Sequence, residues 1–352
     1  MPLRFTTRVV SVGVVPVHTV PLLTLLLLVA GAVTGCQRIE QEPAGPRPTV
    51  SGDYLGQAAP GVIPELFAPG LVGTGLEQRD AAWAPDGSEF FYSHGGPRSA
   101  IVRWQRSGGR WRGPQIAAFS GLFNDIEPAF CPDGSRLYFA SNRPRDDGTE
   151  MRSDYDIWYV ERQIDGWSAP TLTPEPVTSR HDEFYPSLTR DGVLYFTGQR
   201  ENGFGAEDIW RAVPRAGGWG EPECLPTEVN SAGFEFNAFV APDESYLLFT
   251  SWQRAGASGG GDLYVAFRDP DGRWHEAINL GPQINTAALE YCPFVTADGR
   301  WLFFSRKGSA GRDHPTDRPL AITEFLAWAD APGNGQGDIY WVSAAVIDRL
   351  RP

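Results

Sequence analysis

The residues best suited to chemistry are carboxylates and arginines that recur in four successive segments of the chain. A guanidinium placed between two carboxylates can satisfy several hydrogen bonds at once, whereas two carboxylates about 5 to 9 Å apart could hydrolyse a glycosidic bond. Because an active site is seldom copied into every repeat, the recurrence favours a structural charge network, and we assign no catalytic residue. The four sets are Asp125, Arg143 and Asp156; Glu183, Arg200 and Asp208; Glu235, Arg254 and Asp262; and Glu290, Arg306 and Asp338.

The segment that precedes these four breaks the pattern, because it offers Gln78, His94 and Ala100 at the matching places. Loops carried on a rigid framework are where such folds bind ligands, and the first acid of each set should lie on one common face. We therefore predict a ligand face that contains Asp125, Glu183, Glu235, Glu290, His94 and His314.

Other reactive residues are sparse and widely spaced. Cys131, Cys224 and Cys292 lie far apart, with no Cys-x-x-Cys pair, and no His-x-x-x-His or Asp-x-Asp-x-Asp-Gly spacing occurs. No Gly-x-Ser-x-Gly nucleophile motif is present either. We expect no metal site and no cofactor, and calcium held by channel carboxylates remains an alternative that calorimetry would test.

The elements that must position these side chains form an internal repeat. Turns of one kind recur five times, each followed by an aromatic segment such as Leu137-Tyr138-Phe139. Short apolar runs bounded by Pro, Asp and Gly are typical of buried strands joined by tight hairpins. The turns are Ala84-Pro85-Asp86-Gly87, Cys131-Pro132-Asp133-Gly134, Thr189-Arg190-Asp191-Gly192, Ala241-Pro242-Asp243-Glu244 and Thr296-Ala297-Asp298-Gly299.

Each repeat holds enough segments for four strands, which is one blade of a β-propeller. We expect third strands to open at Asp156, Asp208, Asp262 and Asp338, and fourth strands to begin at Trp111, Trp167, Trp219 and Trp274. The last repeat lacks a fourth strand, and residues 63–67 can supply it, closing the ring. The sequence therefore predicts an all-β propeller of five four-stranded antiparallel blades, or six if residues 309–335 or the preceding tether hide another sheet.

These repeats resemble the WD40-like propeller repeats of the periplasmic TolB type. The resemblance rests on Glu-x-x-Pro before the Pro-Asp-Gly turn, an aromatic strand ending in Ser-x-Arg, and a Gly-rich loop into Asp-Ile-Tyr. It covers roughly residues 62–346. The chain departs from TolB itself in lacking a separate N-terminal α/β domain, so no role in the Tol assembly is implied.

The N-terminus resembles a lipoprotein signal peptide. Arg4 and Arg8 precede an apolar run, and Val33-Thr34-Gly35 leads into Cys36, the expected lipidation site. A retained transmembrane anchor is the alternative, although the apolar core is short for a span. We therefore expect a signal at 1–35, a flexible tether at 36–61 and a propeller at 62–352.

Compartment and charge limit the possible partners. Loss of Arg4 and Arg8 takes the formal net charge from −13 to −15, which disfavours nucleic acid. We expect a monomer held by its lipid anchor in the cell envelope, at the outer membrane facing the periplasm, with envelope proteins or glycans as partners. The predicted function is non-catalytic binding or scaffolding, and the alternative is a glycan-active hydrolase or lyase using channel carboxylates.

One loop is much longer than its counterparts. Residues 307–337 of the last repeat include His314 and a segment, 320–331, that could form a short helix with Phe325 and Trp328 on one side. The segment is either a variable insertion packed on the disc or a lid over the channel.

Overall fold

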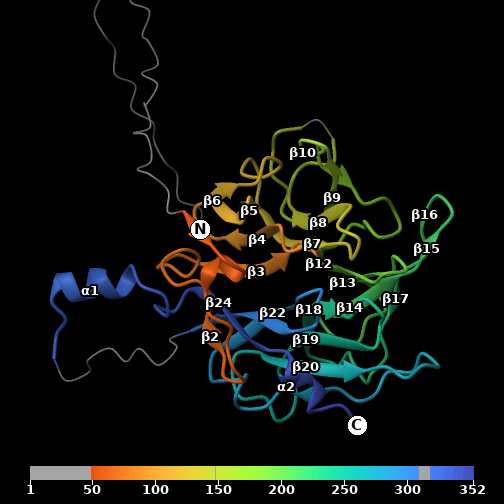
Figure 1. The fold of residues 1–352 in the computed structure, drawn as a ribbon. Coiled ribbons are helices and arrows are strands. Elements are labelled where there is room, and N and C mark those ends of the chain that lie inside the picture. The colour runs from red at the N-terminus through yellow and green to blue at the C-terminus, as the bar shows by residue number, and fades with distance from the viewer. Residues whose placement is uncertain (1–48, 147, 309–317) are drawn as a thin grey trace, which may run out of the picture. The chain divides into compact units, whose positions relative to one another are not determined.

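The computed structural model describes residues 49–146, 148–308 and 318–352, and these form a five-bladed β-propeller. Figure 1 shows the five antiparallel sheets around a common centre, with β3, β7, β12, β18 and β22 innermost. The all-β architecture predicted from the repeats is thereby confirmed.

Each blade contains four strands, which follow one another from the centre outward. The first blade has β3 (Gln78–Trp83), β4 (Glu89–His94), β5 (Ala100–Ser107) and β6 (Arg110–Ile116). The second has β7 (Asp125–Phe130), β8 (Arg136–Ser141), β9 (Asp156–Gln163) and β11 (Thr171–Leu172). The third has β12 (Glu183–Leu188), β13 (Leu194–Gly198), β14 (Asp208–Ala212) and β17 (Glu223–Cys224). The fourth has β18 (Phe234–Val240), β19 (Tyr246–Trp252), β20 (Asp262–Phe267) and β21 (Ile278–Asn279), and the fifth has β22 (Leu289–Val295), β23 (Trp301–Lys307), β24 (Gly337–Ser343) and β2 (Glu65–Leu66).

The repeated turns join the first and second strands of every blade, as predicted. In four of them the glycine takes a φ of +68° to +81°, a left-handed conformation that costs a residue without Cβ little. In the fourth blade Glu244 takes the same place with a φ of +56°. Four of the five turn aspartates accept the backbone N–H two residues on, as Asp86 does from Ser88 at 2.9 Å, so their spacing reflects turn chemistry. In the third blade the Thr189 hydroxyl accepts the Val193 N–H instead.

The outer strands of the second, third and fourth blades begin later than predicted. Trp167 lies in β10 (Gly166–Trp167) and Trp219 in β16 (Gly218–Trp219), which pairs with β15 (Pro214–Arg215). Trp274 forms only an isolated bridge with Arg268. In two of these hairpins an arginine packs over the indole, with Arg162 lying 4.4 Å from the Trp167 ring centroid. The tryptophans therefore mark hairpins that precede the outer strands.

The N-terminal closure of the ring is confirmed. Glu65 and Leu66 of β2 pair with Trp341 and Tyr340 of β24. The next residue, Phe67, is fully buried, and its ring contacts aromatic rings of the first and last blades at centroid distances of 5.1 to 5.9 Å. β2 therefore covers the edge of β24 that would otherwise be the outer edge of the last blade.

Part of the predicted tether belongs to the propeller. Val50–Ser51 form β1, which pairs with β6, and Tyr54–Gly56 form a 3-10 helix. Leu55 is buried, and the indole of Trp111 donates to the Gly52 carbonyl at 2.8 Å. The predicted signal peptide and Cys36 lie outside the described residues. Within the described residues, no helix is long and apolar enough to cross a membrane.

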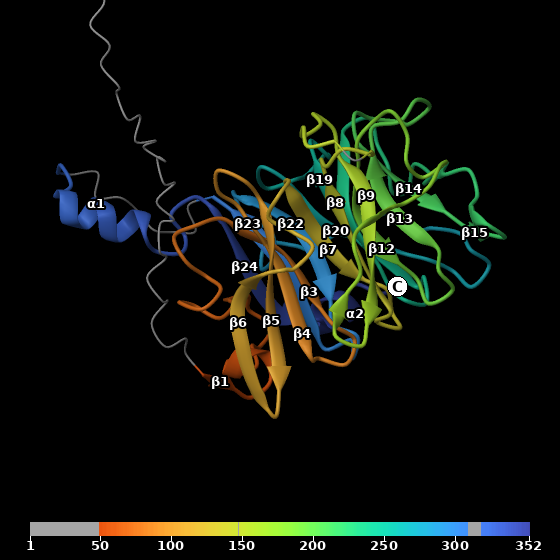
Figure 2. The same cartoon turned by 90° about the horizontal axis from the view of Figure 1, so that it is seen from above.

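The long loop of the last blade contains the predicted short helix. This helix, α1 (Ile322–Ala329), has no buried residue, and it lies away from the sheets in both views (Figures 1 and 2). A second short helix, α2 (Ala345–Asp348), follows β24 and buries Val346 and Ile347. His314 lies outside the described residues.

We predict that Phe67→Ala destabilises the whole ring, because it removes a fully buried ring shared by the first and last blades. The free energy of unfolding should fall by about 3 to 5 kcal/mol in a denaturant titration. Ile63→Ala, at a side chain that is 69% exposed, is the matched control and should change stability by less than about 0.5 kcal/mol. Equal effects of the two substitutions would contradict closure at Phe67.

Candidate functional site

We call the face of the ring at which the inner strands begin the loop face, and the face with the Pro-Asp-Gly turns the turn face. The four predicted ligand-face acids lie at the starts of inner strands there but are fully buried. Each accepts a hydrogen bond from a hydroxyl a few residues earlier, such as Thr286 to Glu290 at 2.6 Å. These acids hold the preceding loops in place through hydrogen bonds. Because they are buried, the expectation that they form an exposed ligand face is corrected for these four residues. The other three pairs are Ser120 to Asp125, Ser179 to Glu183 and Ser231 to Glu235.

The expected arginine fork between two carboxylates does not form in the second, third and fourth blades. Arg143 and Arg200 pair with the first acid of their own sets, at 2.6 Å to Asp125 and 3.1 Å to Glu183. Arg254 instead lies 3.7 Å from Glu276, which is exposed. In the fifth blade, Arg306 likewise pairs with Glu290 at 2.7 Å.

The aspartates that begin the third strands accept hydrogen bonds from backbone N–H groups of the loop before them. Their charge is therefore satisfied without the arginine at the end of the second strand. Asp208 accepts the N–H groups of Phe204 and Gly205, Asp262 that of Ser258, and Asp338 that of Gly333 at 2.7 Å. Carboxylates that accept backbone N–H groups fix loop conformation directly.

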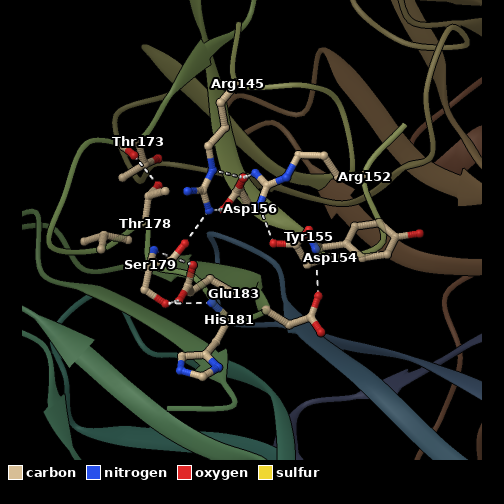
Figure 3. A network of polar contacts seen from close by, with 12 residues as sticks. Arg145, Arg152, Asp154, Tyr155, Asp156, Thr173, Thr178, Ser179, His181 and Glu183 are labelled. Carbon is tan, nitrogen blue, oxygen red and sulfur yellow. Dashed lines mark hydrogen bonds and ion pairs between the residues drawn. The ribbon is translucent and has the colours of Figure 1, made fainter. Parts of the chain in front are cut away.

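Asp156 is the exception, because two arginines bind its carboxylate. Neither of them was singled out from the sequence. Figure 3 shows Arg145 and Arg152 converging on the Asp156 carboxylate. Arg145 also donates to the Ser179 carbonyl, and Ser179 donates to Glu183, so the network joins the second and third blades. All its charges are paired within the protein, which indicates a structural role.

A second cluster, on the propeller axis, was not predicted. Every inner strand holds one residue with a positive φ, between +51° and +63°, although none of the five is glycine. Each inner strand pairs with the second strand of its blade, and the register of this pairing shifts at the positive-φ residue, directly after the residue that precedes it. Such a conformation costs of order 1 kcal/mol or more per residue, so the surroundings must impose it. The five residues are Asp80, Glu127, Tyr185, Asn237 and Cys292.

These side chains and Arg79 form what we call the axial cluster. The Arg79 guanidinium donates to Asp80 at 2.8 Å and to Glu127 at 2.5 Å. Asn237, from a blade that does not adjoin that of Glu127, donates to the same Glu127 oxygen at 3.2 Å. The Tyr185 hydroxyl, in the third blade, donates a hydrogen bond to the Pro293 carbonyl of the fifth blade at 2.9 Å. Contacts between non-adjacent blades place the cluster at the centre of the ring.

Burial dominates the electrostatics of the axial cluster. It raises the pKa of Glu127 to about 7, Arg79 opposes that shift, and Asp80 adds to it. Glu127 can therefore exchange a proton near neutral pH, as a general acid or base must. However, Arg79, Asn237 and the Tyr185 backbone N–H already bind both of its oxygens.

A cavity on the turn face reaches the axial cluster. It has an empty volume of about 650 Å³, including its opening to solvent, and Glu127 and Tyr185 contribute to its lining. Most of the remaining lining is proline and aromatic, including Phe130, Phe239 and Phe294. This lining offers few polar groups to a sugar and suits an apolar group better.

The axial residues could have been found from a single signal in the sequence. They stand two positions after Gln78, Asp125, Glu183, Glu235 and Glu290, at a place where the repeat is otherwise regular. That place changes from Asp to Glu, Tyr, Asn and Cys along the chain. A variable polar residue at a fixed repeat position that faces the axis indicates a cluster assembled from different blades.

Apolar side chains are exposed mainly on the loop face. Among the described residues, nine of the twelve exposed large hydrophobic side chains lie on its loops, at the adjoining strand ends or on α1. Exposed apolar patches of this kind mark interaction sites. The nine are Leu76, Ile116, Leu122, Met151, Phe204, Trp252, Ile322, Phe325 and Leu326. Within the same described ranges, no group of three His, Cys, Asp or Glu side chains is arranged to hold a metal ion.

Comparison with known proteins shows similarity in fold. No family model and no curated protein matches the sequence. Solved structures that align with it include a candidate TolB of Agrobacterium tumefaciens, with 15% identity, a TM-score of 0.46, and coverage of 76% of this chain and 90% of that one. An endo-arabinase of Bacteroides thetaiotaomicron aligns with 15% identity and a TM-score of 0.43, over 72% and 97% of the two chains. An α-L-arabinofuranosidase of Lactobacillus brevis aligns with 12% identity and a TM-score of 0.44, over 75% and 90%. Because one fold can host many unrelated activities, function must be argued from the site.

We predict that Arg79→Met is strongly destabilising, because it leaves Glu127 and Asp80 buried without their cation. Removing one partner of a buried pair costs about 3 to 5 kcal/mol of unfolding free energy. Arg79→Met combined with Glu127→Gln should recover part of this loss. Arg180→Met, at an exposed pair with Glu201, is the control and should cost less than about 1 kcal/mol. An Arg79→Met protein as stable as the control would contradict the axial cluster.

We predict that Glu183 makes stability depend on pH. Burial raises its pKa from 4.5 to about 7 in the folded protein. The folded state therefore holds the proton more tightly, and stability falls as pH rises from about 4.5 to about 7. Relative to Glu183→Gln, the wild-type protein should lose about 3 kcal/mol of unfolding free energy across this window. The control Glu201→Gln, at an exposed residue, keeps Glu183 and should show the same pH profile as the wild type. Parallel pH profiles for wild type and Glu183→Gln would refute the shift.

Proposed function

We propose that this protein is an envelope lipoprotein, anchored through Cys36, whose propeller binds partner proteins without catalysis. The observation that supports it best is the concentration of exposed apolar side chains on the loop face. The turn face is different, since only Ile63, Ile164 and Val213 are comparably exposed on its described strand connections.

The state of the carboxylates also favours binding over catalysis. The acids at the starts of the inner strands are fully buried and hydrogen-bonded to neighbouring hydroxyl groups. A glycosidase needs two carboxyl groups that flank an accessible sugar. Asp80 and Glu127 are instead joined through Arg79 and are almost inaccessible to solvent.

A glycan-active hydrolase is the second candidate, and Glu127 is the observation that favours it. Burial raises the pKa of its carboxyl, which lies at the lining of a cavity. The assay is release of reducing sugar from a panel of envelope and plant polysaccharides by the full-length protein. Turnover that disappears in Glu127→Gln would replace the binding proposal with the hydrolase.

We predict that partners crosslink to the loop face. A photoreactive amino acid at Leu122 or Phe204, both exposed there, should give discrete crosslinked species in intact cells. The same amino acid at Ile164, which is fully exposed on the turn face, is the matched control and should give none. Crosslinks at Ile164 alone would overturn the proposal. The anchor is tested in the same cells, because Cys36→Ala should abolish incorporation of a labelled fatty acid.

A further inference from the structure

The helix α1 is held at both ends, although none of its side chains is buried. At its N-terminal end, Glu324 pairs with Arg318 at 2.7 Å and accepts the backbone N–H of the N-cap residue at 2.9 Å. At its C-terminal end, Asn334 donates to the Ala329 carbonyl at 2.6 Å and to the Gly75 carbonyl of the first blade at 2.7 Å. An isolated helix of eight residues is marginal in water, so these contacts keep α1 formed beside the first blade.

The exposed side chains of α1 form an apolar stripe. Ile322, Phe325 and Leu326 are 68, 47 and 52% exposed. With Ala329 they stand at positions i, i+3, i+4 and i+7, which share one face of a helix. Glu324 follows Ile322 by two positions and so points to the opposite side. Figure 2 shows α1 extending away from the sheets, so this stripe is arranged to meet a surface outside the ring.

The first described strand and α1 lie beside the same blade. Val50 of β1 pairs with Trp111 at one end of β6. Ile116, at the other end of β6, is five residues from Trp111 and therefore about 17 Å away. Ile116, His94 and Ala329 line one hollow, so the base of α1 adjoins this end of β6. Little more than the length of one strand thus separates Val50 from the base of α1.

The predicted lipid at Cys36 limits how far a membrane can lie from α1. Cys36 precedes Val50 by 14 residues, which span at most about 50 Å when fully extended. A bilayer that holds this lipid is therefore within about 50 Å of Val50, which exceeds the length of β6. A membrane is thus the surface that the chain itself would keep within reach of α1.

We propose that α1 lies in the interface of the membrane that holds the Cys36 lipid, with Ile322, Phe325 and Leu326 directed toward the acyl chains. Amphipathic helices bind membranes in this way, with the apolar face at the boundary between headgroups and acyl chains. The inference rests on the lipid anchor of the proposed function. Its consequence is a second attachment, which fixes the orientation of the ring at the membrane.

The lipid that fits α1 is zwitterionic. The one charged residue of the helix, Glu324, is already paired with Arg318. The net charge of −13 opposes approach to an anionic surface. Exposed apolar side chains on other blades, such as Phe204, stay available to protein partners.

The test is photolabelling from within the bilayer. The acylated protein is reconstituted into phosphatidylcholine vesicles that contain a small fraction of a phosphatidylcholine with a diazirine in its acyl chain. After irradiation, peptide mass spectrometry should place the label on α1, at least about tenfold above the label at Ile164. Ile164 is fully exposed on the turn face of the second blade and serves as the internal comparison.

The double variant Phe325→Gln with Leu326→Gln keeps good helix formers at both positions and should lower the α1 label about tenfold. Met151→Gln with Phe204→Gln is the matched control, because these loop-face side chains are similarly exposed but belong to other blades. It should leave the α1 label unchanged. All four side chains are exposed, so both proteins should unfold at the wild-type temperature.

An α1 label no stronger than that at Ile164, or one that survives in the Phe325 and Leu326 double variant, would overturn the assignment. So would a dimer of the detergent-solubilised protein that this double variant dissociates, because a second copy would then cover the stripe. Acylated protein with an unlabelled α1 refutes the helix contact and leaves the proposed function intact. Protein that carries no acyl chain on Cys36 refutes the anchor, and this inference with it.

Discussion

The axial cluster depends on a single guanidinium, because Arg79 is the cation that pairs with both Asp80 and Glu127 at the centre of the ring. Two carboxylates brought out of water repel each other, and the cation between them makes their burial tolerable. The left-handed residue in each inner strand belongs to the same arrangement, since it stands where the inner strand changes register. Asn237 and Tyr185 then extend the cluster to further blades. The five sheets are similar, but the residues that contact one another at the axis of the ring differ from blade to blade.

Repetition separates structural charges from candidate functional ones. The buried acid at the start of the inner strand and its hydroxyl partner recur in four blades, and the arginine over two aromatic rings recurs in the same four. Such groups hold loops to strand ends. The first blade has a neutral pair, Gln78 and His94, in this frame. His94 also contributes to the lining of a hollow on the loop face.

The two faces of the ring differ in chemistry. The turn face opens into a cavity lined mostly by proline and aromatic side chains, which ends at the axial cluster. The loop face carries most of the exposed apolar side chains, together with the hollow of the first blade. Hydrogen bonds hold the buried acids at the starts of the inner strands, so these acids are not exposed on the loop face.

The sequence by itself determined the architecture, because turn residues and aromatic strands report local backbone geometry that recurs in each blade. It also predicted the closing strand at residues 63–67 and the helix in 320–331. Only the tertiary structure decided which charges meet. Arg143 and Asp156 belong to one repeat, yet Asp156 binds Arg145 and Arg152, because loop conformation places those guanidinium groups nearer. Arg79 and Glu127 lie 48 residues apart and in different blades, and the packing of the inner strands β3 and β7 at the axis brings them together.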